Sequence, residues 1–544
     1  MSDRVVKVAV DATQSEPLRR IWRYVGYDEP NYTYTERGNE LLGKLGRLAD
    51  GPYFIRCHFL LCTGSGIGSP KWGSTNVYTE DERGRPVYDF TLVDRIFDTY
   101  LESGCTPFVE LGFMPKALST APDEVPYEAT WDAAWAYPPT DYGRWRDLIA
   151  AIAAHCLERY GLREVSRWYW ELWNEPDIGY WRGTVQEYCN LYDYTVAGLH
   201  SILPQAYVGG PGTTSPARGE AGDFLRRFLQ HCSAGTNAAT GGRGTRLDFV
   251  SFHTKGGGYR TDDRAAKQTP SIFELVRHVA AGLDITAAFP KYRGLEVVLS
   301  ECDPDGWAAG SRHDNWNLEF RNTEYYASYL ANTVCQLMDL GRDGPNRVDG
   351  MLTWAFQFED REYFEGLRTL STNGVDKPVL NVLRLLARLG RTRLELWSEG
   401  HRDPVAAGGS DRPDTLPDLS GLAALDDDGT ISVFLSCHHD DWDLESTTDV
   451  DLQLRGLEPG HYQLRRLVVD DSDANAYATW VEMGRPIDPT GEQIADMKSA
   501  ARLRAAEVGT AESTDGVLTT RVSMKSHSVW LLELHHASDG AVRT

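Results

Sequence analysis

Two glutamates follow strand-like apolar stretches, and together they could carry out acid–base and nucleophilic chemistry. Glu175 lies in WYWELWNEPDIGYW (168–181), and Glu301 follows LEVVLS (295–300). A carboxyl group packed against aromatic rings loses hydration and favours its protonated form, which suits a general acid. A second carboxylate nearby could act as a nucleophile. Two such groups facing one another form the catalytic pair of enzymes that cleave glycosidic bonds.

The neighbours of Glu175 favour a functional role over the usual fate of a strand-end glutamate, which is solvation or an ion pair. Pro176 cannot continue sheet pairing, so the strand ends beside the carboxylate. Asn174 can reach a sugar hydroxyl with either end of its amide. Carboxyl groups about 5–5.5 Å apart would retain the anomeric configuration, whereas a gap of about 6.5–9.5 Å would invert it. The sequence leaves both outcomes open.

Eight short strand-like stretches alternate with longer amphipathic stretches up to about residue 395, which indicates a parallel sheet. Eight repeats fit a closed (β/α)8 TIM barrel of the α/β class, in which chemistry takes place at the carboxyl ends of the strands. Glu175 then ends the fourth strand and Glu301 the seventh, so the two face one another across the barrel mouth. The predicted strands are 20–27, 53–61, 107–113, 167–175, 206–211, 247–254, 295–302 and 349–358.

The pattern changes after residue 395 to short segments in which apolar and polar residues alternate. GTISVFLSCHH, DVDLQLRGL and HYQLRRLVVD have this period of two, and Gly and Asp turns separate them. Such segments are typical of an antiparallel β-sandwich. We therefore expect a catalytic barrel over residues 1–395 and a β-sandwich accessory domain over 396–544. Residues 400–418 are rich in Gly, Pro and Asp, and we expect a linker or long surface loop there.

Composition narrows the class of protein. A formal charge of −24 argues against nucleic acid and other polyanionic partners, although it is silent about neutral ligands. No apolar run approaches the roughly 20 residues of a membrane span, so no membrane partner is expected. The N-terminus shows no apolar segment typical of a secretory signal. The nine scattered cysteines are therefore expected to be reduced core thiols of a cytoplasmic protein.

Two other motifs were weighed for cofactor chemistry. CHHDDWD (437–443) contains residue types that bind zinc, but it is consecutive and has no spaced partner motif. GSGIGSP (64–70) is glycine-rich but does not open a helical pattern, which favours a flexible loop at the barrel mouth over a phosphate-binding loop. We expect neither a metal nor a cofactor.

The ordered set of motifs resembles glycoside hydrolase family 39, which contains β-xylosidases and α-L-iduronidases. ELWNEPDIGYW is similar to the acid/base motif of that family, and the resemblance runs from about residue 20 to 535. It implies that Glu175 is the acid/base, that Glu301 is the nucleophile and that the C-terminal part packs as a β-sandwich on the barrel. The other motifs in family order are YFIRCHFLL, PFVELGFMP, LYDYTVAGLHSILPQAYVGGP, DFVSFHTKG, VVLSECDPDGW and DDSDANAYATWVEMGRPIDPTGEQI.

Further residues near strand ends are candidates for substrate binding. Arg56 and His58 share one strand face, so they can point together into the barrel mouth. Without the resemblance, Arg56 would more often belong to a core ion pair and His58 would be a core histidine. With the resemblance, we expect Arg56 to stabilise the nucleophile and His58 to bond a sugar hydroxyl. Trp354 could stack on a sugar ring, with core packing as the alternative. The remaining candidates are Asn174, His253, Trp307 and Glu359.

Lys255 bears on the choice of substrate. HTKG (253–256) is closer to the iduronidase pattern, in which the lysine meets the sugar carboxylate, than to the β-xylosidase pattern. The iduronidases also use an arginine near the eighth strand, where this sequence has Asp349-Gly350. We therefore expect a retaining exo-β-D-xylosidase that releases a terminal pentose from xylosides or xylo-oligosaccharides. The alternatives are a uronate hydrolase that resembles α-L-iduronidase and a non-catalytic carbohydrate-binding protein. A homo-oligomer is left open.

Overall fold

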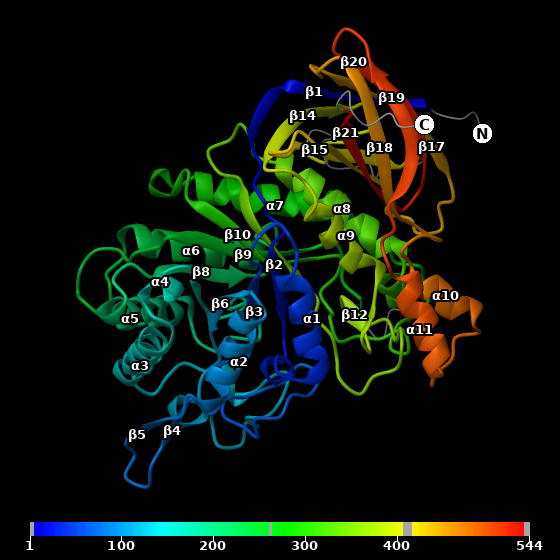
Figure 1. The fold of residues 1–544 in the computed structure, drawn as a ribbon. Coiled ribbons are helices and arrows are strands. Elements are labelled where there is room, and N and C mark those ends of the chain that lie inside the picture. The colour runs from blue at the N-terminus through cyan, green and yellow to red at the C-terminus, as the bar shows by residue number, and fades with distance from the viewer. Residues whose placement is uncertain (1–4, 260–263, 406–415, 538–544) are drawn as a thin grey trace.

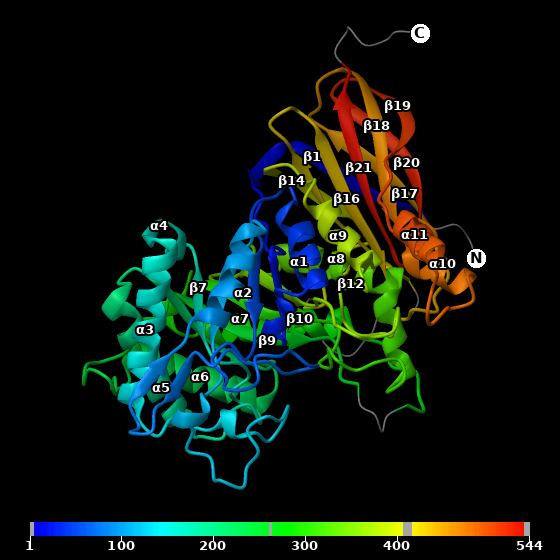
Figure 2. The same cartoon turned by 60° about the horizontal axis from the view of Figure 1, so that its bottom comes forward.

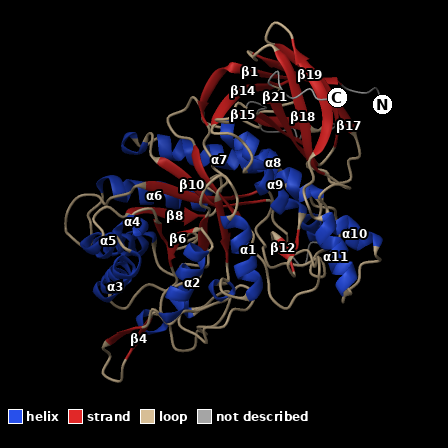
Figure 3. Cartoon of the chain, viewed as in Figure 1, coloured by secondary structure: helices blue, strands red, loops and turns tan. Residues whose placement is uncertain are grey.

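The computed structural model describes residues 5–259, 264–405 and 416–537, and its first domain is a closed barrel of parallel strands. All eight predicted strands are present, so the predicted (β/α)8 barrel is confirmed. Helices surround the strands on the outside (Figures 1 and 3). In spatial order the strands are β2 (Tyr24–Tyr27), β3 (Phe54–Cys57), β6 (Thr106–Leu111), β7 (Tyr169–Leu172), β8 (Tyr207–Thr213), β9 (Phe249–Lys255), β10 (Glu296–Asp303) and β11 (Val348–Trp354).

Several helices around the barrel begin at residues whose side chains accept from the first backbone N–H groups. Thr184 and Glu187 form a capping box at the start of α5 (Val185–Ile202), and the Asp141 side chain accepts from two backbone N–H groups at the start of α3 (Tyr142–Tyr160). The helices are α1 (Glu36–Gly46), α2 (Thr91–Glu102), α3 (Tyr142–Tyr160), α4 (Leu162–Val165), α5 (Val185–Ile202), α6 (Gly219–Ala234), α7 (Ile272–Ala287), α8 (Glu324–Asp339) and α9 (Pro378–Leu386).

Aromatic side chains fill the amino end of the barrel interior. They come from the first residues of successive strands and pack into one cluster that includes Tyr24, Phe108 and Phe249. Glu296, which interrupts the apolar pattern of the seventh strand, accepts hydrogen bonds from the hydroxyls of Tyr169 and Tyr207 at 2.6 and 2.8 Å. Because this end of the barrel is filled, a ligand can enter only at the carboxyl ends of the strands.

The second domain is one nine-stranded sheet that folds over itself. Strands far apart in the sheet order contribute to a single apolar core, which gives the packing of a sandwich. The sheet order is β19 (Ala506–Ser513), β18 (Gly460–Val469), β21 (Ser528–His536), β16 (Ile431–His438), β15 (Asp418–Leu425), β14 (Thr392–Ser398), β1 (Val5–Pro17), β17 (Thr447–Arg455) and β20 (Val517–Lys525).

The N-terminal strand corrects the expected division of the chain. The boundary at residue 395 placed β1 with the barrel, but β1 lies between β14 and β17 in the second sheet (Figure 1). It pairs antiparallel with β14 and parallel with β17, so the sheet is not purely antiparallel. The reason is its alternating pattern, which buries Val6, Val8 and Val10 in the core of this sheet. The predicted linker 400–418 lies mostly outside the described residues.

A helical insert of the second domain packs against the barrel. It comprises α10 (Ala476–Glu482) and α11 (Gly491–Ala500), which join β18 to β19 and lie beside the barrel (Figure 2). The side-chain amide of Asn381 on α9 donates to the carbonyls of Ala474 and Ala501 at the two ends of this insert. Trp480 packs with Phe364, which belongs to the loop after β11. The second domain therefore supports loops that lie at the mouth of the barrel.

Two further observations concern the whole chain. All nine cysteines lie within the described residues, are buried and form no disulfide, as expected for core thiols. No helix within the described ranges has the length and apolar character of a membrane span.

The placement of β1 predicts the effect of a small cavity in the second core. Val8→Ala should lower the free energy of unfolding of the second domain by about 1–3 kcal/mol, because Val8 is buried and its lost methyl groups leave a void. Denaturant unfolding measures this change. The matched control is Lys7→Ala on the exposed face of the same strand, and equal effects of the two substitutions would contradict the placement.

Candidate active site

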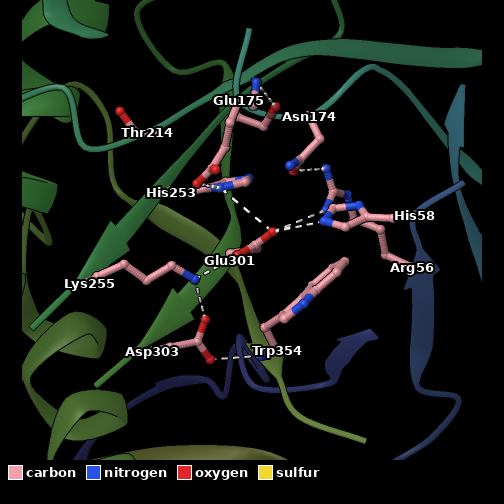
Figure 4. A network of polar contacts seen from close by, with 12 residues as sticks. Arg56, His58, Asn174, Glu175, Thr214, His253, Lys255, Glu301, Asp303 and Trp354 are labelled. Atoms are coloured by element: carbon pink, nitrogen blue, oxygen red, sulfur yellow. Dashed lines mark hydrogen bonds and ion pairs between the residues drawn. The ribbon is translucent and has the colours of Figure 1, made fainter. Parts of the chain in front are cut away.

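Glu301 lies near the end of β10, at a point where the strand register shifts. Leu299 pairs with Phe252, but Glu301 pairs with His253, so Ser300 is an extra residue in β10 relative to β9. Such an irregularity re-aims the side chains that follow it. The Glu301 carboxylate consequently points into the barrel mouth, where it is buried and only 8% of its side chain is exposed (Figure 4).

Glu175 lies three residues beyond β7 in an unusual backbone conformation. Its φ is +43°, in the left-handed region that non-glycine residues rarely adopt. Its backbone N–H donates to the carbonyl of Gly212 at 2.8 Å, which fixes this turn against β8. Oε1 of Glu175 lies 3.0 Å from Nδ1 of His253, and the same His253 nitrogen lies 3.8 Å from Oε1 of Glu301. The nearest carboxylate oxygens of Glu175 and Glu301 are within 4.8 Å of one another.

A fully buried guanidinium lies directly behind the two carboxylates. Arg56 pairs with Glu171 (Nε to Oε2, 2.6 Å) and with Glu110 (Nη2 to Oε2, 2.9 Å), and its Nη1 lies 3.7 Å from Glu301 Oε1. Nη2 also donates to Oδ1 of Asn174 at 3.1 Å. This bond orients the Asn174 amide, and its NH2 group has no hydrogen-bonding partner among the described residues. Asn174 can therefore donate to a ligand in the cavity.

Lys255 and His58 control the charge of Glu301. The Lys255 ammonium lies 2.6 Å from Glu301 Oε2 and also donates to Asp303. His58 Nε2 lies 3.4 Å from Glu301 Oε1. Burial alone would raise the pKa of Glu301, but Lys255 and histidines 58 and 253 outweigh it and hold that pKa well below the usual range. Glu301 is therefore ionised at neutral pH, as a nucleophile requires.

His58 carries a positive charge at neutral pH. Its Nδ1 lies 2.6 Å from Oε2 of Glu110. Burial lowers the pKa of His58, but the attraction of Glu110 and Glu301 reverses this effect and raises the pKa to about 9. Its ring also packs against Trp354 with a centroid distance of 4.3 Å. This tryptophan is held in turn by Asp303, which accepts from its backbone N–H at 2.8 Å.

The cavity above these residues has a volume of about 290 Å³. Seven predicted residues line it: His58, Asn174, Glu175, Lys255, Glu301, Trp307 and Trp354. Arg56 and His253 lie in the layer behind, where they contact the carboxylates. The residues that sequence analysis missed include Asp28, Lys71, Trp131, Tyr180 and Arg368.

Two of the missed residues carry a sequence signal. Asp28 directly follows β2, just as His58 directly follows β3, so the strand-end criterion could have found it. Tyr180 lies within the motif ELWNEPDIGYW. Lys71, Trp131 and Arg368 come from long loops, where no periodic pattern predicts direction.

Glu359 and Asp349 take other places than expected. Glu359 does not line the cavity; its carboxylate accepts from Thr35, which caps α1, and from Gln357. These bonds join the loop after β11 to the start of α1, which favours a structural role.

Asp349 lies at the start of β11, at the opposite end of the barrel, and pairs with Arg19. Arg368, which comes from the loop after β11, is an arginine that lines the cavity.

The residue types at the site include metal ligands. Within the described part of the chain, one group of His, Cys, Asp and Glu side chains has suitable spacing, namely Glu175, His253 and Glu301. The Lys255 ammonium, 2.6 Å from Glu301, occupies that carboxylate and would repel a cation. The absence of a metal stays a prediction. In CHHDDWD, His438 instead contacts Ser328 of α8, and Asp443 pairs with Lys267.

Comparison with known proteins agrees with this fold and identifies the family. The family model of glycosyl hydrolases family 39 matches residues 6–519. The chain is 27% identical to the β-xylosidase of Geobacillus stearothermophilus over 511 residues, which cover 89% of this chain and 87% of the relative. The chain is also 28% identical to human α-L-iduronidase over an alignment of 587 residues, which covers 97% of this chain and 78% of the relative.

Solved structures show the same architecture. One described as the bacterial orthologue of human α-L-iduronidase has a TM-score of 0.78 at 24% identity and covers 99% of this chain and 85% of that one. A monomeric β-xylosidase from Caulobacter crescentus CB15 has a TM-score of 0.75 at 24% identity. The match covers 98% of this chain and 100% of that one. Because the family model spans both glutamates and most of the two domains, this chain belongs to glycosyl hydrolase family 39.

Proposed function

We propose that this chain is a retaining exo-β-D-xylosidase that acts by double displacement. The observation that carries the proposal is the carboxylate pair, whose nearest oxygens lie within 4.8 Å of one another. This separation suits retention, because an inverting enzyme needs a gap of about 6.5–9.5 Å to hold a water molecule.

In this proposal each carboxylate has its own step. The ionised Glu301 attacks the anomeric carbon, and Glu175 gives its proton to the leaving oxygen, so a glycosyl ester forms as the aglycone departs. Glu175 then takes a proton from water, and the hydroxyl attacks the same carbon to release Glu301. Asn174 donates to a sugar hydroxyl. Since both carboxylates are present and line one cavity, a non-catalytic binding protein is the weaker alternative.

Charge balance around Lys255 favours a neutral sugar. The ammonium is already paired with Glu301 and Asp303, so its charge is compensated within the protein. A cavity of about 290 Å³ lies at the small end of small-molecule sites, which favours a terminal pentose over an internal segment of a polymer. The relative from Geobacillus stearothermophilus is a β-xylosidase.

A uronate glycone is the second candidate, and Arg368 favours it. The Arg368 guanidinium lines the same cavity as Lys255, so two cations could meet one sugar carboxylate. Against this, Arg368 is itself engaged: it donates to the carbonyl of Trp354 at 2.9 Å and pairs with Asp303 and Asp305. Human α-L-iduronidase is as similar to this chain as the β-xylosidases are.

We also propose a cytoplasmic protein with a carbohydrate as its partner. Nine buried thiols without a disulfide suit a reducing compartment.

The role of Glu175 predicts how the rate responds to the leaving group. Glu175→Ala should slow aryl xylosides with poor leaving groups far more than those with good ones, because protonation of the departing oxygen is lost. Azide should restore turnover and give a glycosyl azide of retained configuration. In the matched variant Glu301→Ala, azide should give the inverted product. Equal slowing of all leaving groups in Glu175→Ala would count against the assignment.

The pKa of Glu301 predicts a shift in the pH profile. Glu301 must be ionised to react, and Lys255 is the largest influence that holds its pKa low. Lys255→Met should therefore raise that pKa and move the acid limb of kcat/KM to higher pH. Lys71→Met is the comparison, because Lys71 lines the same cavity but pairs with Asp28. An unmoved acid limb in Lys255→Met would contradict this account.

The glycone is tested by initial rates on aryl β-xyloside, α-L-arabinoside, β-glucoside and α-L-iduronide. The wild-type enzyme should prefer the β-xyloside. If Lys255 instead binds a uronate, Lys255→Met should lose about 10- to 150-fold on the iduronide relative to the xyloside, the contribution of one charge-assisted bond. The ratio of the two rates cancels losses that both substrates share. A wild-type enzyme faster on the iduronide would overturn the choice of pentose and leave the roles of both glutamates intact.

A further inference from the structure

A second cavity, of about 150 Å³, lies in the accessory domain between β18 and the end of the helical insert. Figure 2 shows β18 and β19 side by side, with α11 near one end of the sheet. Its polar lining consists of Arg466 on β18, Ser472 and Asp473 after that strand, Ser499 on α11, and Arg502 and Arg504 before β19. It shares no lining residue with the cavity that holds Glu175 and Glu301.

Three arginines around this cavity have no ion-pair partner within the described residues. The only carboxylate in the lining is Asp473, so three positive charges face one negative charge and the lining carries +2. This is unusual in a chain whose formal net charge is −24. Elsewhere in the protein, arginines such as Arg321 and Arg384 pair with aspartates.

Among the three arginines, Arg466 has an aromatic contact that orients its guanidinium. Its guanidinium lies over the ring of Trp530, 4.5 Å from the centroid, and this stacking fixes its plane. Its Nε is buried and has no hydrogen-bonding partner.

The end of α11 explains only part of the cluster. The carbonyls at a helix C-terminus attract cations, and Arg504 donates to the carbonyl and the hydroxyl of Ser499 at 3.5 and 3.1 Å. Arg502 makes no such side-chain bond in the described structure. Arg466 belongs to a strand of the sheet, so capping of the helix does not account for it.

We propose that this cavity binds a small oxyanion. A planar guanidinium offers paired N–H donors that match the oxygens of a carboxylate, phosphate or sulfate group, and the hydroxyls of Ser472 and Ser499 lie at the same cavity. The oxyanion is either free, as inorganic phosphate or sulfate, or the carboxylate of an acidic sugar. The two sources share one recognition chemistry and are separated by experiment.

Binding at this position would also strengthen contact between the domains. The cavity lining includes Ala474 and Ala500. Asn381 of the barrel helix α9 donates to the carbonyls of Ala474 and Ala501, which adjoin the same cavity. An anion held between β18 and the end of α11 should therefore raise the thermal unfolding temperature of the full chain, since a ligand that binds only the folded state stabilises it.

Calorimetric titration of the full chain with phosphate, sulfate and glucuronate tests the proposal, with chloride at matched ionic strength as the blank. At least one oxyanion should bind saturably, with a Kd on the order of 1 mM or below. Arg502→Ala and Arg504→Ala should each weaken it about 10-fold or more, as expected for a charge-assisted bond. The matched control is Arg465→Ala, which removes an exposed arginine from the same strand and should leave binding unchanged.

Three results would overturn the proposal. One is the lack of saturable binding by any of the three anions. Another is equal binding by wild type, Arg502→Ala and Arg504→Ala. The third is a signal abolished by Lys255→Met instead, which would place the anion in the active-site cavity. A preference for phosphate or sulfate identifies a free anion, whereas a preference for glucuronate identifies an acidic sugar. Only the third outcome bears on the glycone, because an active site that accepts a uronate would bind glucuronate through Lys255.

Discussion

The burial of one guanidinium among three carboxylates is the constraint on which the barrel mouth depends. Arg56 is fully buried and contacts Glu110, Glu171 and Glu301, which come from strands β6, β7 and β10. Charges withdrawn from water are tolerated only when they are paired and hydrogen-bonded. Because each partner belongs to a different strand, the ion pairs hold the strand ends in one arrangement.

Three carboxylates facing one arginine leave excess negative charge, and the site balances it with two further cations. His58 is protonated against Glu110, and Lys255 lies against Glu301. The same pairs that make burial tolerable also keep the proposed nucleophile ionised. Glu175, with 16% of its side chain exposed, lies at the edge of this network, and its carboxylate lies 3.0 Å from Nδ1 of His253. The two glutamates thus have different environments, which is how two identical groups can take opposite roles.

The loops above the site depend on a second set of buried ion pairs. Arg321 binds Asp305, and Arg368 donates to the carbonyl of Asp305, so the loops after β10 and β11 are joined. The buried amino group of Lys377 donates to the carbonyl of Leu367 beside Arg368. From outside, the insert of the second domain packs Trp480 on Phe364. The accessory domain therefore contributes to the shape of the cavity without lining it.

The sequence alone determined the barrel, the accessory sheet, the two glutamates and five further residues that line the cavity. These features are local: alternation and amphipathic periodicity report which face of a segment is buried, and polar residues directly after a strand lie at the barrel mouth. Only the tertiary structure decided the distance between Glu175 and Glu301, which depends on the register shift at Ser300 and the left-handed turn at Glu175. It also decided the place of β1 in the second sheet and the arrival of Arg368 in the cavity. Contacts between residues hundreds of positions apart, and the paths of loops that lack a periodic pattern, depend on closure of the barrel and on packing between the domains. No short stretch of sequence contains that information.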